Sequence, residues 1–140
     1  MKIHPDYKFI VALNKTIEPG VALNATAHVS LSICAQASPE QKSLMSFIPY
    51  EDGNGFEHPS ISALSLIVLR GRPIDLKKLH EAAQEKEILC ADFIQTMTGG
   101  TYADQLEKTK ETTDITYYAV ALFGRKEEID SLTKRLSLYS

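Results

Sequence analysis

A histidine in the middle of a small and apolar stretch is the first residue that suggests chemistry. The stretch GVALNATAHVSLS runs from Gly20 to Ser32 and contains Asn24 and His28. On a helix these two polar residues are one turn apart and share a face. Because neutral imidazole has one donor and one acceptor, and an ordinary pKa of about 6.5, His28 is a candidate general base. The alternative is a core histidine that Asn24 or a backbone carbonyl satisfies.

An aspartate interrupts a second apolar stretch, ILCADFIQTM. A carboxylate in a buried strand must be paired, hydrogen-bonded or neutralised, which makes Asp92 the second candidate for a polar site. Thr96 follows four residues later and lies on the same face if the strand is regular. The alternative is that Asp92 starts a bend or caps a neighbouring helix. Sequence spacing alone does not bring His28, Asp92 and Thr96 together.

The other chemistry-bearing residues favour structural roles. Residues 98–101, TGGT, could present backbone N–H groups to an anion, but they lack the lysine of a P-loop, which favours a turn and a helix cap. We interpret the other three histidines, which show no metal-ligand spacing, as surface residues: His4, His58 and His80. Cys34 and Cys90 form no CxxC motif and are expected to be buried thiols. We expect neither a metal nor a cofactor.

The composition is that of an ordinary globular protein. The chain has 140 residues, of which 44% are hydrophobic and 24% charged, and this predicts one domain over residues 1–140. No apolar run approaches the roughly 18 residues of a membrane span, and the N-terminus lacks the apolar core of a signal peptide. We therefore expect a cytoplasmic protein with no membrane partner. The net charge of -3 provides no general attraction for nucleic acid.

Strand and helix patterns alternate along the chain. Apolar runs predict strands over residues 7–14, 64–69, 88–97 and 115–123, with an extended segment over 46–49. Helical periodicity and capping residues predict helices over residues 20–37, 75–86, 101–110 and 127–136, with a short one after the cap residue Ser38. This alternation indicates an α/β fold, in which ligands usually bind beyond the carboxyl ends of the strands.

The order of these elements resembles the type II peptidyl-tRNA hydrolase fold. The resemblance rests on a strand, a Pro-Gly loop, a small-residue helix with a histidine, a later Asp-x-x-x-Thr, and a strand that ends in LFG before a closing helix. More closely, VALNKTIEPGVALNATAHVSLS and YYAVALFGRKEEIDSLTKRLSLY resemble an uncharacterised bacterial family that shares that fold. The resemblance implies a three-layer α/β/α sandwich with a four-stranded mixed sheet, assembled as a homodimer.

Half of the polar pattern of the hydrolases is present. Their helix glycine and histidine match Gly20 and His28, and their later aspartate and threonine match Asp92 and Thr96. Their helix lysine, however, is replaced by Val21. A valine can neither contact a substrate phosphate nor stabilise a developing oxyanion. The missing lysine and the acidic chain argue against tRNA as a partner.

Three functions are compatible with these residues. The favoured one is the binding of a small ligand in a polar pocket bordered by Asn14, Gly20, Asn24, His28, Asp92 and Thr96. The second is hydrolysis of an acyl ester such as peptidyl-tRNA, in which His28 or Asp92 activates water and Thr96 orients it. The third is a non-catalytic, dimeric interaction protein whose polar helix residues satisfy one another.

Overall fold

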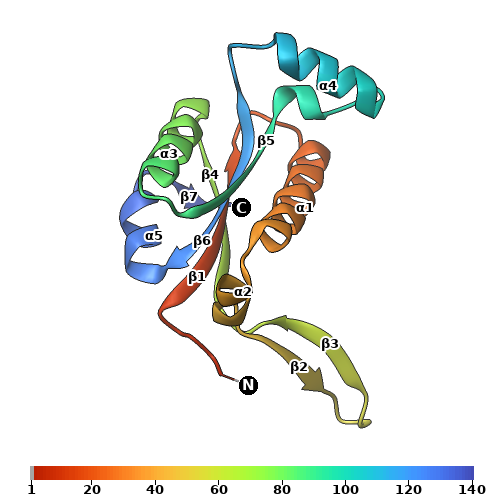
Figure 1. Cartoon of the computed structure of the whole chain (residues 1–140), viewed down its shortest axis with the longest axis vertical. Helices are drawn as coiled ribbons and strands as arrows, with labels where there is room; N and C mark the ends of the chain where they lie inside the picture. Colours follow the sequence, from red (N-terminus) through yellow and green to blue (C-terminus); the bar gives the residue numbers. More distant parts are fainter. Residues whose placement is uncertain (1) are drawn as a thin grey trace.

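A five-stranded mixed sheet forms the centre of the protein in the computed structural model, which describes residues 2–140 (Figure 1). The strand order is β5-β6-β1-β4-β7, and β1 and β4 are parallel while the other neighbours are antiparallel. The strands are β1 (Tyr7–Asn14), β4 (Leu66–Gly71), β5 (Leu89–Ile94), β6 (Tyr117–Arg125) and β7 (Ser137–Leu138). The sheet has five strands rather than the expected four. The additional strand, β7, has two residues and is too short to show a hydrophobic period.

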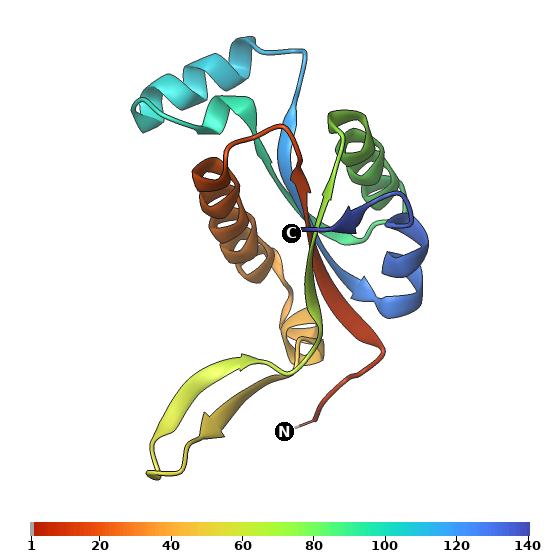
Figure 2. The ribbon, with the colours of Figure 1, turned by 180° about the vertical axis from the view of Figure 1, so that it is seen from behind.

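Helices cover both faces of this sheet, as the alternating pattern predicts (Figures 1 and 2). The helices are α1 (Pro19–Gln36), α2 (Pro39–Leu44), α3 (Pro73–Glu85), α4 (Tyr102–Glu111) and α5 (Lys126–Leu132), with a 3-10 turn η1 (Gln95–Met97). Alternation along β1 divides the core in two. Val11 packs with α1 on one face, whereas Ile10 packs with α3 and α5 on the other.

Local signals explain where the helices begin. Pro19 and Pro73 occupy the first turns of α1 and α3, where a missing N–H costs no helical hydrogen bond. Ser38 caps α2 and Thr101 caps α4, and each forms the predicted capping box, with Gln41 and Asp104 respectively. None of the helices within residues 2–140 is long and apolar enough to cross a membrane.

A two-stranded hairpin projects from the body of the protein, beyond α2 (Figure 2). It consists of β2 (Phe47–Glu51) and β3 (Glu57–Ser62), joined by a turn in which the Asp52 carboxylate accepts hydrogen bonds from the N–H groups of Asn54 and Phe56. The sequence predicts only the extended segment over residues 46–49. The strand β3, EHPSIS, is exposed along most of its length, so it lacks the buried alternation that identifies a strand.

Two predicted elements are shorter in the structure. The strand expected over residues 88–97 ends at Ile94, because the chain turns into η1 there. The closing helix expected over residues 127–136 ends at Leu132, and the chain then continues to β7 beside β4. The first of these differences shapes the site, because the turn at η1 brings Thr96 against Thr109 of α4 and packs Met97 against the core cluster that α1 covers.

Candidate functional site

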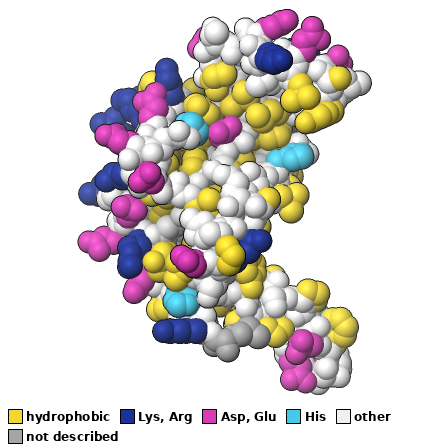
Figure 3. Space-filling model, in the orientation of Figure 1, with side chains coloured by type: hydrophobic (Ala, Val, Ile, Leu, Met, Phe, Trp, Pro, Cys, Tyr) yellow, Lys and Arg dark blue, Asp and Glu magenta, His cyan; other side chains and the backbone are white. Residues whose placement is uncertain are grey.

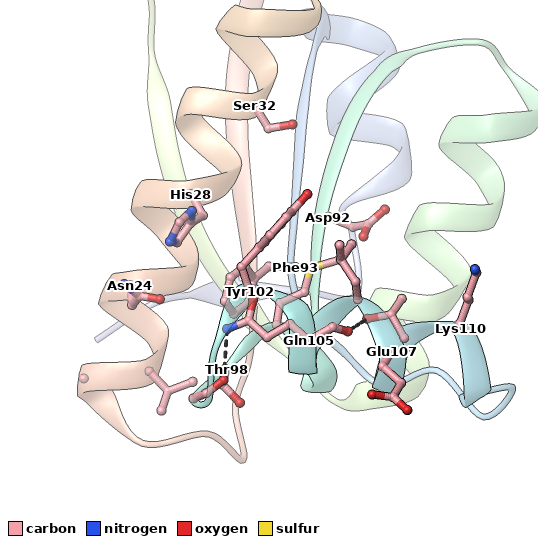
Figure 4. A pocket seen from close by; sticks show the side chains of 16 residues that line it. Asn24, His28, Ser32, Asp92, Phe93, Thr98, Tyr102, Gln105, Glu107 and Lys110 are labelled. Atoms are coloured by element: carbon pink, nitrogen blue, oxygen red, sulfur yellow. Dashed lines mark hydrogen bonds between the residues drawn. The ribbon is translucent and has the colours of Figure 1, made fainter.

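A cleft of about 1270 Å³ opens between α1, η1 and α4, beside the edge strand β5 (Figure 4). One face of α1 lines it with side chains spaced about one turn apart, namely Val21, Asn24, His28 and Ser32. Opposite them, α4 contributes Tyr102, Gln105, Leu106, Glu107, Thr109 and Lys110, and β5 with the following turn contributes Asp92, Phe93, Met97 and Thr98. Figure 3 shows hydrophobic side chains gathered around this hollow.

His28 lies on the exposed side of α1 and faces the cleft. Its ring stacks on Phe93 of β5, with ring centroids 5.4 Å apart and planes inclined by 23°. Asn24, one turn earlier, also lines the cleft, and within residues 2–140 it makes no hydrogen bond to His28. The alternative of a buried core histidine satisfied by Asn24 is therefore wrong.

Asp92 is paired, as a carboxylate in an apolar strand requires. Ala91 and Phe93 pack toward α1, so the alternation of β5 directs the Asp92 carboxylate to the opposite face, toward α3. There its Oδ2 lies 3.1 Å from Nε2 of His80. Figure 4 shows the carboxylate pointing away from His28. Asp92 is one of the residues that line the cleft, but its carboxylate and the His28 ring lie on different sides of the strand.

The interpretation of His80 as a surface residue is wrong. Its side chain is 15% exposed, and its ring stacks on Tyr117 with centroids 4.5 Å apart. The Tyr117 hydroxyl lies 3.2 Å from Nδ1 of His80, which completes a chain of hydrogen bonds from β6 through α3 to β5. The sequence feature that indicates partial burial is the position of His80 directly after the buried Leu79, at the border of the apolar face of its helix.

Thr96 and Asn14 lie outside the cleft, in structural roles. Thr96 is buried in η1, and its hydroxyl lies 2.6 Å from that of Thr109 on α4. Asn14 ends β1, where its amide donates to the Tyr117 carbonyl and its side-chain oxygen accepts from the N–H and hydroxyl groups of Thr16. Of the residues that the sequence assigns to a pocket, the structure brings together Gly20, Asn24, His28 and Asp92 and leaves these two out.

The sequence interpretation missed the contribution of α4. Tyr102, Leu106 and Lys110 are spaced one helical turn apart, and this spacing is the signal that they share a face. Gln105 donates to the carbonyl of Gly99 over 2.9 Å and so fixes the loop at the mouth of the cleft. Among the described lining residues Lys110 is the one cation. The cleft therefore has a lysine, on a different element from the position that Val21 occupies.

On the α3 side of the sheet, away from the cleft, the surroundings keep one thiol and one phenol protonated. Burial, together with the Asp92 carboxylate, raises the pKa of the Cys90 thiol to about 12, which makes this cysteine a poor nucleophile at neutral pH. Burial first, and then the same carboxylate, raises the pKa of Tyr117. Within residues 2–140 no group of three or more His, Cys, Asp or Glu side chains is arranged to hold a metal ion.

Comparison with known proteins relates the chain to proteins of unknown function. One solved structure, that of the protein of unknown function Atu0240 from Agrobacterium tumefaciens strain C58, superposes with a TM-score of 0.79 at 24% identity. The similarity covers 96% of this chain and 98% of that one, and it shows that the two share a fold. No curated protein matches the chain. The family profile "Protein of unknown function (DUF2000)" matches residues 7–140, and the chain therefore belongs to the DUF2000 family.

Proposed function

We propose that the protein binds an organic ligand whose planar, uncharged group enters the cleft between α1 and α4. The observation that carries this proposal is the cleft itself, whose volume of about 1270 Å³ is large enough for ligands that occupy pockets of roughly 300–1000 Å³. It lies at one end of the sheet, in the region where α/β proteins commonly bind their ligands.

The lining residues define the chemistry of this ligand. Phe93, His28 and Tyr102 provide flat rings, and stacked aromatic pairs contribute about 0.5–1.5 kcal/mol beyond the burial of their area. The helix α1 carries no Lys, Arg, Asp or Glu, so the wall that it forms favours an uncharged group. The amides of Asn24 and Gln105 border the cleft and supply donors and acceptors that orient the ligand.

The same geometry leads us to favour binding over hydrolysis of an acyl ester. A general base and an orienting hydroxyl must both reach one reacting water. Here the Asp92 carboxylate faces α3, the His28 ring faces the cleft, and the Thr96 hydroxyl is occupied by Thr109. We expect peptidyl-tRNA and simple aryl esters to be turned over no faster with the protein than without it.

A screen of small aromatic heterocycles, followed by amide NMR, tests the binding proposal. The chain offers a matched pair of variants, because each histidine contacts one phenylalanine ring. His28 stacks on Phe93 in the cleft, and His58 meets Phe56 edge to face in the hairpin. Fragments are expected to shift the resonances of residues 20–32 and 97–110. His28→Ala should weaken their binding by about three- to tenfold, in line with the loss of one stacked ring, and His58→Ala should leave it unchanged.

Two results would contradict the proposal. One is a screen in which no fragment shifts a resonance of the cleft. The other is binding that His28→Ala and His58→Ala weaken equally, because an effect common to both variants does not originate in the cleft.

The projecting hairpin favours a second candidate function, self-association. A two-stranded hairpin is at best marginally stable alone, yet this one exposes Phe56 and Ile61 by 59% and 60%. The uncharged helix α1, with Leu23 and Leu31 exposed, lies on the same side of the sheet as the hairpin (Figure 2). We propose that the hairpin of one copy packs on α1 of another. Sedimentation velocity is expected to show a dimer for the wild type and a monomer for the double variant Phe56→Ser, Ile61→Ser. A double variant that remains a dimer would contradict the proposed contact between the hairpin and α1.

A further inference from the structure

The strand β5 has an open edge. It pairs with β6 on one side, and within residues 2–140 no strand lies on the other. Two contacts identify the residues whose backbone groups point away from β6. The Cys90 carbonyl accepts a hydrogen bond from the Gln36 side chain over 3.1 Å, and the Ile94 N–H lies 3.5 Å from the Met97 sulfur. Backbone direction alternates along a strand, so residues 90, 92 and 94 form the outward set.

Asp92 lies at the centre of this outward set. Its N–H and carbonyl point away from β6, and no hydrogen bond joins either group to another described residue outside the sheet. Outward backbone groups on an edge strand are a template for a further strand. The neighbouring outward groups at Cys90 and Ile94 are already in contact with Gln36 and Met97, so the open template is centred on Asp92.

The open edge continues into the cleft. Asp92 and Phe93 both line the cleft, and Ser32 and His28 of α1 lie along its other wall. In Figure 1 the edge of β5 runs between α3 on one side and α1 on the other. A strand beside β5 would therefore direct alternate side chains to two different places. Those that share a face with Phe93 would enter the cleft, and those that share a face with Asp92 would turn toward α3.

We propose that this edge binds an extended peptide segment as a sixth strand, with a basic side chain opposite Asp92 and apolar or aromatic side chains in the cleft. The inference rests on the proposed function, because it uses the same cleft, and it names the class of ligand. Main-chain hydrogen bonds supply the affinity of such strand addition, and the alternate side chains supply its specificity.

Charge favours a basic peptide over a second copy of this chain. One carboxylate oxygen of Asp92 is engaged by His80, and its Oδ1 makes no hydrogen bond to a described residue. Glu81 adds a further negative charge near Tyr117 on the same face. Antiparallel self-pairing centred on Asp92 would place two carboxylates directly opposite each other, which is destabilising. A lysine or arginine at that position would instead pair with Asp92.

A pair of synthetic peptides tests the backbone pairing directly. The parent probe is acetyl-TVFKFVT-amide, whose lysine and phenylalanines lie on opposite faces of a strand. One variant carries a methyl group on the backbone amide nitrogen of the lysine, and the other carries it on the backbone amide nitrogen of the adjacent phenylalanine. Because strand pairing uses alternate amides, one methyl group should weaken binding at least about tenfold and the other should be tolerated. In the bound protein the amide resonances of Cys90 and Asp92 should shift.

Variants of the protein separate charge from backbone. Asp92→Asn keeps the backbone and should weaken binding of the lysine peptide while leaving binding of a glutamine-for-lysine peptide unchanged. Asp92→Pro removes the outward N–H and should abolish binding of both peptides. If the proline variant does not fold, the N-methylated peptides still give the answer, because they require no change in the protein.

Three outcomes overturn the inference. The first is no binding of the parent peptide up to about 1 mM, the weak end of measurable affinity. The second is equal binding of the two N-methylated peptides. The third is a free protein whose Asp92 amide is protected from exchange at high concentration and exposed on dilution, since this shows that a second copy occupies the edge. If aromatic fragments bind in the cleft and the peptides do not bind, strand addition at β5 is wrong and the proposed binding function stands. If neither the fragments nor the peptides bind, the proposed binding function is wrong as well.

Discussion

Two asparagines that the sequence assigns to one pocket occupy very different environments. Asn14 is 1% exposed at the end of β1, and its side chain joins three backbone or hydroxyl groups from β6 and the following loop. Asn24 lies on the exposed face of α1 and lines the cleft. A buried amide that satisfies several partners contributes to stability, whereas an exposed amide on a cleft wall is available to a ligand.

This difference predicts opposite effects for the same substitution. Asn14→Ala leaves the Tyr117 carbonyl and the Thr16 N–H without their partner, and we expect it to lower the free energy of unfolding by about 1–3 kcal/mol. Asn24→Ala is the control and should change it by less than about 0.5 kcal/mol. Urea denaturation followed by circular dichroism measures both values, and equal losses would contradict the structural role of Asn14.

A buried carboxylate at the start of α3 makes stability depend on pH. The Arg72 side chain donates to both oxygens of Asp75, and this pairing lowers the pKa of Asp75 below its ordinary value. Asp75 therefore binds a proton more tightly in the unfolded chain than in the folded protein. The stability that the ionised Asp75 contributes is fully present above the unfolded pKa of about 3.9, and it is lost as the pH falls through the lower folded pKa.

The corresponding variant is Asp75→Asn. Its stability deficit relative to the wild type should be largest near neutral pH and should shrink once the pH falls below about 4. Urea denaturation at a series of pH values measures the difference. A deficit that stays constant into the acid range would show that the Asp75 charge does not cause it.

At the scale of elements, α4 is held mainly by polar contacts. It has no fully buried residue, and its hydrogen bonds to other segments are the Thr96–Thr109 hydroxyl pair and the bond from Gln105 to the Gly99 carbonyl. Helices with few buried apolar contacts open more readily than the core. The wall of the cleft that α4 forms is therefore more easily displaced than the wall that α1 forms.

Thr96→Val should loosen α4 specifically. It keeps the shape of the side chain but removes the hydroxyl that Thr109 contacts, so we expect amide hydrogen exchange in residues 102–111 to accelerate about two- to tenfold, with no change in α1. Thr112→Val is a matched control, because the hydroxyl of Thr112 contacts only the Lys108 carbonyl at the end of α4. Equal acceleration in both variants would argue against the role of Thr96.

At the scale of the whole molecule, the hairpin and the sheet are separate in their packing. Neither hydrophobic cluster of the body contains a residue of β2 or β3. The base of the hairpin is closed by a hydrogen bond from the Ala63 N–H to the Ser46 carbonyl, so a short connection can replace everything beyond it.

Replacing residues 48–61 with a short Gly-Ser turn is therefore expected to leave the body folded. The free energy of unfolding should change by less than about 1 kcal/mol, because no core contact is lost. Urea denaturation and near-ultraviolet circular dichroism check this outcome. A large loss of stability in a monomeric sample would show that the hairpin supports the core.

The sequence by itself determined the elements and much of their order. Continuous apolar runs identified the four long strands, because strands covered on both faces consist of such runs. Ser38 with Gln41, and Thr101 with Asp104, identified two helix starts, because a capping box is a local interaction between residues three apart. The likeness to an uncharacterised family was also visible in the sequence, and the DUF2000 match agrees with it.

Only the tertiary structure decided which side chains meet. Spacing predicted that Asp92 and Thr96 share a face, but β5 ends at Ile94, so Thr96 turns under α4 while Asp92 faces His80. The alternation of side chains along a strand predicts which residues share a face of the sheet, but it does not predict which helix packs on that face. The open edge at Asp92 and the position of His28 above Phe93 likewise depend on strand order and helix packing, which are set by contacts between residues far apart in the chain.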